Sequence, residues 1–334
     1  MKGGMKRVFV TRRIPDEGLK LLGRRKDIDL DMYERDRIIP RRELLRRVRG
    51  AHVVLSILTD KMDEEVMRAA GEQLKMIANY AVGFNNIDLE AARERQIIVS
   101  NTPGPEIVES VAEHTVALIF ALAHRIVETD NFTRAGRYHG WGPELLLGTD
   151  VVGKTLGIIG TGDIGMGVAK RIHDGFGVKI LYNDVKRNAA MEKKYGAKFR
   201  TKMQLLKEAD FVTLHVPLLP ATHHLISTKE LKAMKKTAFL INTSRGPVVD
   251  ELALVKALTR KEIAGAGLDV YECEPIIDCN PRDNYALRKL SNVILTPHTA
   301  SATVEARQAM SRTVAKNILA FLDGKRVPNR VLMP

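Results

Sequence analysis

The fold is decided by the stretch LGIIGTGDIGMGVAKRIHDGFGVKILYND, residues 156–184. An apolar run at Leu156–Ile159 predicts a buried parallel strand, and the amphipathic residues from Ile164 to about Phe176 predict a helix. A second apolar run, Val178–Tyr182, predicts the next strand. The glycines after the first strand therefore stand in a strand–turn–helix–strand unit, the setting in which a glycine-rich turn binds a phosphate.

Residues 160–165, Gly-Thr-Gly-Asp-Ile-Gly, predict a dinucleotide site. Gly160 permits a tight turn, Gly162 has no Cβ to keep a pyrophosphate from the backbone, and Gly165 permits close packing of helix and strand. The free N–H groups at the start of the helix then face the anion. The predicted cofactor loop is completed by Thr161, Asp163 and Ile164.

Asp184 lies 19 residues after Gly165, close to the spacing expected of an acid that accepts hydrogen bonds from a ribose diol. A carboxylate at this place would repel the 2′-phosphate of NADP, so the sequence favours NAD as the cofactor. Lys186 and Arg187 follow closely and would soften that repulsion. Use of NADP therefore stays open.

The composition is that of a folded protein with a sizeable core, and its 334 residues predict two domains. The net charge is +13, but the basic residues are spread along the chain and aromatic residues make up only 5%. We therefore expect no nucleic-acid partner, although the charge would attract small anions. The longest apolar run, Thr115–Ala123, is too short to span a bilayer, so we expect no membrane partner.

The sequence has no spacing typical of a metal site. Its two cysteines, Cys273 and Cys279, form no CxxC motif and predict reduced thiols in a cytoplasmic protein. Met1–Arg13 is basic and holds no apolar signal core, which also indicates the cytoplasm. His223 and His224 have no ligand partner at a recognisable spacing, so we predict surface or packing roles for them and no metal.

Apolar runs alternate with helical stretches along most of the chain, which predicts an α/β protein with parallel sheets covered by helices on both faces. Residues 1–100 show this alternation without a glycine fingerprint after Val10, so this half is not the nucleotide site. A long helix is predicted from Glu106 to about Glu128, followed by a polar connection over residues 131–150. Residues 154–298 form the second α/β region.

The side chains that could do chemistry follow predicted strands of the second region. Arg245 follows the strand at Ala238–Ile241, three acids follow the strand around Gly267, and His298 follows Val293–Leu295. Ligands of such sheets gather at the carboxyl ends of the strands. Reduction of a 2-oxo acid by hydride transfer needs these types: a guanidinium to bind carboxylate and carbonyl, an imidazole to deliver the proton, and a carboxylate to fix the ring.

The chain resembles the D-isomer-specific 2-hydroxyacid dehydrogenases, and within them the glyoxylate/hydroxypyruvate reductases, over nearly its whole length. The stretch at residues 134–150, RAGRYHGWGPELLLGTD, also resembles the reductase subgroup. The more specific motifs are GKTLGIIGTGDIG at 153–165, FLINTSRGPVVD at 239–250, AGAGLDVYECEP at 264–275 and LTPHTASAT at 295–303.

The resemblance implies a catalytic triad of Arg245, Glu274 and His298. Arg245 would bind the substrate, His298 would be the acid/base, and Glu274 would pair with the histidine. Glu272 is a rival for that role, but the acid directly before proline matches the position in the family. Three further residues would bind the cofactor: Asp269 at the nicotinamide carboxamide, and Thr243 and Ser244 along its length.

The resemblance also implies two doubly wound parallel-sheet domains with a cleft between them. Residues 102–298 would form a Rossmann domain for the cofactor. Residues 1–101 and 299–334 would form a flavodoxin-like domain for the substrate, with the backbone amides of Val82 and Gly83 holding the substrate carboxylate.

Two residues add open questions to this picture. Asp163 stands where the family often has arginine, and a carboxylate beside the pyrophosphate would weaken cofactor binding unless it turns away or meets a cation. Trp141, the only tryptophan, is either a core or interface anchor or an aromatic that reaches the active site of a neighbouring subunit; both interpretations favour a homodimer. Two other functions stay open: a 3-phosphoglycerate dehydrogenase without a regulatory domain, and a non-enzymatic NAD-sensing scaffold similar to transcriptional corepressors.

Overall fold

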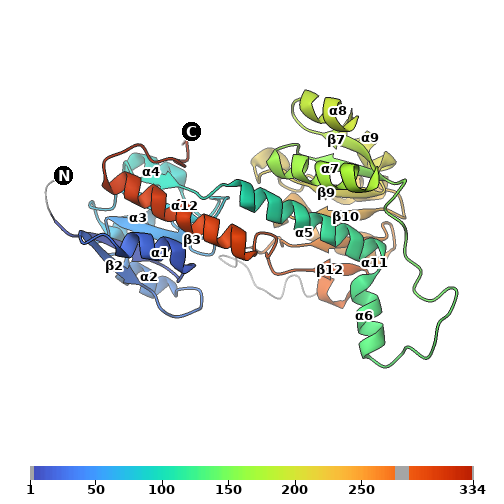
Figure 1. Ribbon diagram of the computed structural model, residues 1–334, viewed down its shortest axis with the longest axis horizontal. Coiled ribbons are helices and arrows are strands. Elements are labelled where there is room, and N and C mark those ends of the chain that lie inside the picture. Colours follow the sequence, from blue (N-terminus) through green and yellow to red (C-terminus); the bar gives the residue numbers. More distant parts are fainter. Residues whose placement is uncertain (1–3, 275–285, 333–334) are drawn as a thin grey trace. The chain divides into compact units, whose positions relative to one another are not determined.

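The computed structural model describes residues 4–274 and 286–332 (Figure 1). Contacts within the chain divide it into two compact units. Unit 1 holds the chain up to Ile107 and again from Thr303 onward. Unit 2 holds Val108–Glu274 and the described residues from 286 to Ala302. Pro275, the last residue of one predicted motif, and Cys279 lie outside the described residues.

Unit 1 is built on a five-stranded parallel sheet in the order β2-β1-β3-β4-β5. This is a doubly wound order, with its switch between β1 and β3. The strands are β1 Lys6–Val10, β2 Ile28–Met32, β3 Val53–Ile57, β4 Met76–Tyr80 and β5 Ile98–Ser100, and the helices are α1 Asp16–Gly23, α2 Arg41–Arg47, α3 Glu64–Ala70, α4 Leu89–Glu94 and α12 Val304–Leu322.

The C-terminal helix α12 returns to unit 1 and packs against α1 and β4. The Gly18 N–H of α1 donates to Ser311 Oγ of α12 at 2.9 Å, and the Tyr80 hydroxyl donates to the Arg307 carbonyl at 2.8 Å. The two ends of the chain therefore stabilise the same unit, as the red and blue ribbons show (Figure 1).

Unit 2 is built on a seven-stranded parallel sheet in the order β12-β11-β10-β9-β6-β7-β8. The chain runs from β6 outward to β8 and then returns to β9 on the other side of β6, so the switch point lies between β6 and β9. The strands are β6 Thr155–Ile159, β7 Lys179–Asn183, β8 Lys198–Phe199, β9 Phe211–Leu214, β10 Phe239–Asn242, β11 Gly265–Leu268 and β12 Val293–Leu295.

Helices and short 3-10 turns connect these strands. Helix α7 follows β6 directly, and its apolar side holds buried Val168, Ala169 and Ile172. The full set is α5 Pro105–Ala123, α6 Ile126–Arg134, α7 Asp163–Phe176, α8 Ala189–Tyr195, α9 Lys202–Glu208, α10 Thr228–Ala233, α11 Glu251–Thr259, η1 Pro220–Thr222, η2 Gly246–Val248 and η3 Leu287–Lys289.

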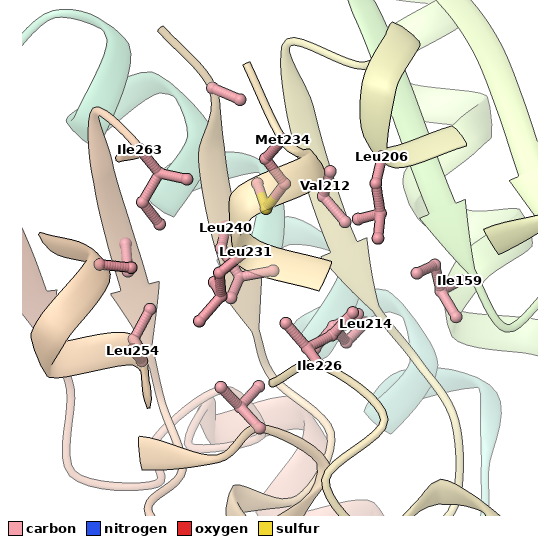
Figure 2. Close-up of a cluster of buried hydrophobic side chains, with 14 of the residues drawn as sticks. Ile159, Leu206, Val212, Leu214, Ile226, Leu231, Met234, Leu240, Leu254 and Ile263 are labelled. Carbon is pink, nitrogen blue, oxygen red and sulfur yellow. The ribbon is translucent and has the colours of Figure 1, made fainter. Parts of the chain in front are cut away.

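A large apolar cluster covers one part of the second sheet. Figure 2 shows Val212 of β9 and Leu240 of β10 beside Leu206 of α9, Leu231 of α10 and Leu254 of α11. These side chains are almost completely removed from water. Each buried leucine stabilises the unit by about 2 kcal/mol relative to an exposed one.

Two expectations for the segment after residue 105 are wrong. The single helix predicted from Glu106 to about Glu128 is two helices, because Arg125 adopts a left-handed backbone conformation with φ +53° between α5 and α6. The polar connection consequently begins after Arg134 rather than at residue 131. Trp141 in this connection is 83% exposed, which excludes the interpretation as a core residue of its own chain.

Among the described helices, none is by itself long and apolar enough to cross a membrane. Helices α5 and α6 pass that test of length and composition only as a pair, and they are bent by 60° at their break.

Candidate active site

The glycine turn after β6 has the shape that a dinucleotide requires. Gly160 has φ +95°, and a Cβ there would come within 2.7 Å of the His215 backbone. A Cβ on Gly165 would come within 2.2 Å of the Gly160 carbonyl oxygen, so that position must be glycine for α7 to start here. Gly162 is the N-cap of α7 and has open space around it. The turn thus presents bare backbone and a helix N-terminus at the switch point of the sheet.

Asp184 follows β7 and is tied to the same turn. Its Oδ2 accepts hydrogen bonds from the N–H and the hydroxyl of Thr161, both at 2.7 Å, and its Oδ1 accepts from the Val185 N–H at 2.7 Å. Burial raises the pKa of Asp184, but these hydrogen bonds outweigh burial and the pKa lies below its ordinary value. A fixed carboxylate at this place fits a ribose diol.

Asp163 and Ile164 open α7. Asp163 is exposed and lies in the first turn of the helix, where the helix dipole favours a negative charge. The carboxylate therefore occupies the end of the helix at which the predicted pyrophosphate would bind.

His215, directly after β9, was not singled out from the sequence. Its N–H donates to the Ile159 carbonyl at 2.8 Å, which places it at the switch point beside the glycine turn. Both ring nitrogens are buried and have no hydrogen-bond partner among the described residues, although the residue as a whole is partly exposed. Burial lowers the pKa of His215 to about 3, so the imidazole is neutral. The burial of the nitrogens decides this pKa because they carry the charge.

The structure brings His298 and Glu274 into contact. His298 Nδ1 and Glu274 Oε2 are 2.9 Å apart, and both side chains are largely buried. The His298 backbone has φ +55°, a left-handed conformation that is uncommon outside glycine. The pair leaves Nε2 of the imidazole as the nitrogen that can exchange a proton with a ligand.

Asp269 holds the loop that carries His298. Its Oδ1 accepts from the Thr296 hydroxyl at 2.6 Å and from the Thr299 N–H at 2.8 Å, and its Oδ2 accepts from the Ala300 N–H at 2.8 Å. The His298 N–H donates to the Asp269 carbonyl at 2.9 Å. Asp269 is fully buried, so its carboxylate positions the histidine loop whatever else it contacts.

Arg245 follows β10, and its side chain lies close enough to Glu274 to be affected by the charge of that carboxylate. Its Nη1 donates to the Ser244 carbonyl at 2.6 Å. Burial lowers the pKa of Arg245, and the nearby charge of Glu274 acts in the opposite direction. Ser244 and Thr243 are almost buried; the Ser244 N–H donates to Asn242 Oδ1 at 3.0 Å, and the Thr243 hydroxyl lies 2.9 Å from that of Thr115.

Val82 and Gly83 follow β4 in unit 1. The carbonyl oxygens of these residues accept from Asn101 Nδ2 at 2.7 Å and Asn79 Nδ2 at 3.0 Å, which fixes the turn. Within the described chain neither amide N–H donates to a protein acceptor. The turn can therefore offer two N–H groups to an anion.

Three features near the site were missed or mistaken in the sequence. Cys273 is disulfide-bonded, so the expectation of a reduced thiol is wrong at this position. His114 of α5 lies 3.1 Å from the Thr296 hydroxyl, next to Asp269, and no spacing in the sequence signals that contact. Glu272 pairs with His224 at 2.6 Å rather than with His298, across 48 residues of chain.

The chain belongs to the D-isomer-specific 2-hydroxyacid dehydrogenase family. Residues 116–300 match the family described as "D-isomer specific 2-hydroxyacid dehydrogenase, NAD binding domain". The match spans more than half of the chain and includes the glycine turn, Arg245 and the His298–Glu274 pair. The predicted family, the α/β fold with two parallel sheets, the oxidoreductase class and an NAD(P) cofactor are confirmed.

Individual relatives are similar over their full length. The chain is 47% identical over 329 residues to a glyoxylate reductase of Thermococcus litoralis, covering 97% of this chain and 96% of the relative. It is 46% identical to a glyoxylate reductase of Korarchaeum cryptofilum, covering 97% and 95%. A crystal structure of a protein from Thermus thermophilus is 42% identical with a TM-score of 0.88, covering 98% of this chain and 100% of that one.

Proposed function

We propose that this enzyme reduces glyoxylate, and hydroxypyruvate beside it, to the 2-hydroxy acid with NADH. The observation that carries the proposal is the His298–Glu274 contact of 2.9 Å at the strand ends of the sheet that also holds Arg245 and the glycine turn. The full-length similarity to glyoxylate reductases supports the choice of substrate.

A bound nicotinamide would supply the hydride, and the residues of this chain supply the rest. His298 donates a proton from Nε2 to the carbonyl oxygen as negative charge develops there. Glu274 accepts a hydrogen bond from Nδ1–H, which fixes the ring and stabilises the imidazolium before Nε2 donates its proton. The pair works as acid in reduction and as base in oxidation.

Arg245 binds the substrate in one geometry. Its guanidinium forms parallel hydrogen bonds to the carboxylate and the carbonyl of a 2-oxo acid, so the carbonyl carbon is presented in a fixed orientation. The N–H groups of Val82 and Gly83 complete the binding of the carboxylate. In this proposal residues 102–298 bind the cofactor, and residues 1–101 and 299–334 bind the substrate.

The cofactor is held by backbone and carboxylate groups rather than by bulky side chains. The α7 N-terminus and Gly162 face the pyrophosphate, and Asp184 accepts from the ribose hydroxyls. The fixed charge of Asp184 repels a 2′-phosphate, so NADH is preferred to NADPH. Asp269, Thr243 and Ser244 line the nicotinamide end.

We also propose that the enzyme is a homodimer, with Trp141 in the interface and close to the partner's substrate. Its exposure of 83% supports burial by a second chain. A cytoplasmic location also stays a prediction, and the disulfide at Cys273 removes the argument from reduced thiols.

The test is the loss of NADH absorbance with glyoxylate, hydroxypyruvate and a panel of larger 2-oxo acids, repeated with NADPH. We expect turnover of the two small acids and faster turnover with NADH. His298→Asn keeps the left-handed backbone but removes the acid, and should lower kcat by about 10²- to 10⁴-fold while NADH binding is unchanged. Glu274→Gln should lower kcat in the same direction. An enzyme that binds NADH but turns over none of these acids would refute the proposal.

A further inference from the structure

The residues His223, His224 and Glu272, here called the histidine cluster, lie together in unit 2 outside the proposed triad. Their ligand atoms all lie within 4.8 Å of one another. His223 and His224 follow η1, and Glu272 follows β11. The three side chains thus join the loops that follow two different strands.

The carboxylate of Glu272 is oriented by backbone contacts. The Glu251 N–H donates to Glu272 Oε2 at 3.2 Å, and the Glu272 N–H donates to the Glu251 carboxylate at 3.0 Å. Its other oxygen, Oε1, therefore points to His224 Nε2, 2.6 Å away. One oxygen is held by the fold and the other faces the imidazoles.

The two imidazoles are held on the same side of the loop. Their ring centroids are 4.0 Å apart and the rings are inclined by 28°. His224 has φ +50°, and its N–H donates to the Pro247 carbonyl at 2.8 Å, next to Arg245. An ion pair between His224 and Glu272 explains two members of the cluster but leaves no role for His223, which is exposed.

We propose that His223, His224 and Glu272 bind a divalent transition-metal ion of the Zn²⁺ type. Two imidazoles and one carboxylate are a ligand set that suits Zn²⁺, whereas Mg²⁺ and Ca²⁺ prefer oxygen ligands alone. With Zn–ligand distances of about 2.0–2.2 Å, ligands of one ion lie roughly 3–3.5 Å apart. Because the ligand atoms already lie within 4.8 Å of one another, shifts of about 1 Å would bring them to that spacing.

Bound metal ties the loop after β9 to the segment that carries Glu274. Glu272 lies two residues before Glu274, and His224 bonds to η2, which follows Arg245. Metal binding therefore stabilises unit 2 and fixes the surroundings of two residues of the proposed triad, independently of which substrate the enzyme reduces.

The test is titration of the tag-free protein with ZnCl₂ by calorimetry at neutral pH, with Co²⁺ absorption as a second readout of the ligand geometry. We expect one Zn²⁺ per chain, a higher thermal midpoint with Zn²⁺, and no competition by excess Mg²⁺. His223→Ala and Glu272→Gln should each weaken Zn²⁺ binding by at least about 10-fold, the smallest loss usual even for residues that only support a ligand. His224→Asn, which tolerates the left-handed backbone, should do the same.

Two control variants locate the ion. His139→Ala removes an exposed histidine outside the cluster and should leave binding unchanged. His298→Asn removes the other close histidine–glutamate contact, and should also leave Zn²⁺ binding unchanged although it lowers turnover. The proposal is overturned if wild-type protein binds no Zn²⁺, or if its binding survives His223→Ala and Glu272→Gln. Loss of binding in His298→Asn instead would place the ion at the His298–Glu274 contact.

Discussion

Asp163 places two effects in opposition at the first residue of α7. Its carboxylate stabilises the positive end of the helix, typically by 0.3–1 kcal/mol, but repels the pyrophosphate proposed to bind there. We expect Asp163→Arg to tighten NADH binding by about 10-fold, since replacing a repulsion by an attraction at an exposed site changes the binding free energy by roughly 1.4 kcal/mol. The same change should lower the thermal midpoint of the free enzyme slightly. Fluorescence titration with NADH measures the affinity; an unchanged dissociation constant would mean that the side chain points away from the cofactor.

His215 makes the enzyme sensitive to acid. Its folded pKa of about 3 lies below the ordinary value of 6.5, so between these values the unfolded chain binds a proton that the folded chain does not. The stabilising contribution is fully present above pH 6.5 and is lost as the pH falls toward 3, at about 1.4 kcal/mol per pH unit. In urea unfolding, the free energy of unfolding should therefore be about 2 kcal/mol lower at pH 5 than at pH 7, and this difference should be absent in His215→Phe. An equal loss in both proteins would contradict this account.

Some contacts of individual residues could be predicted from the sequence and others could not. The strand ends predicted that an acid would lie near His298, because the carboxyl ends of parallel strands share one edge of the sheet. The choice of Glu274 over Glu272 came from the family resemblance, and the structure has Glu274 in contact with His298. The contact of Glu272 with His224 was not predicted, because the loop after β9 has no period that sets its direction. The conformation of a loop depends on its packing against residues that are distant in the sequence. Cys273 lies in such a loop, and its disulfide was not predicted either.

Some elements were predicted closely and others were not. The strand predicted at Val293–Leu295 agrees with β12 at both ends, although its three apolar side chains are only partly buried. Helices α8 to α11 were not predicted individually. The break between α5 and α6 depends on one left-handed residue, Arg125, whose type does not signal it.

The contact between α1 and α12 predicts a stability effect. A Cβ on Gly18 would come within 2.1 Å of the Ser311 carbonyl oxygen, whereas a Cβ on Gly23 of the same helix meets nothing within 4 Å. Gly18→Ala must push the two helices apart and break the hydrogen bond to Ser311, at a cost of about 1–3 kcal/mol. Gly23→Ala is the matched control and should be neutral or slightly stabilising. Chemical denaturation measures the free energy of unfolding of both variants. Equal values for Gly18→Ala and Gly23→Ala would mean that α12 can shift over α1 without loss of stability.

At the scale of the whole molecule, both sheet plans follow from the alternation of strands and helices and from the position of the glycine turn. Each sheet has one switch point, between β1 and β3 in the first and between β6 and β9 in the second. The return of the last helix to the first unit could not be read from periodicity, because hydrogen-bond partners such as Tyr80 and Gly18 lie 227 and 293 residues earlier in the chain. The family resemblance supplied that expectation. The structure divides the chain after Ile107 and Ala302, whereas the sequence placed the boundaries at 101 and 298.

The proposed homodimer rests on the segment between residues 126 and 147. Ile126, Val127, Trp141, Leu145 and Leu147 are all more than 40% exposed there, an apolar surface that a lone chain would leave in water. We expect sedimentation equilibrium to give twice the chain mass of 37.2 kDa.

Trp141→Ser combined with Leu147→Ser should weaken the dimer by at least about 10-fold, because each change removes roughly 1.5–3 kcal/mol of burial. Leu252→Ser, which replaces a 69% exposed leucine on α11, is the control and should leave the mass unchanged. If Trp141 reaches the partner's substrate, the double variant should also lose turnover in proportion to the monomer fraction, and a wild-type protein that sediments as a single chain would overturn the proposed dimer.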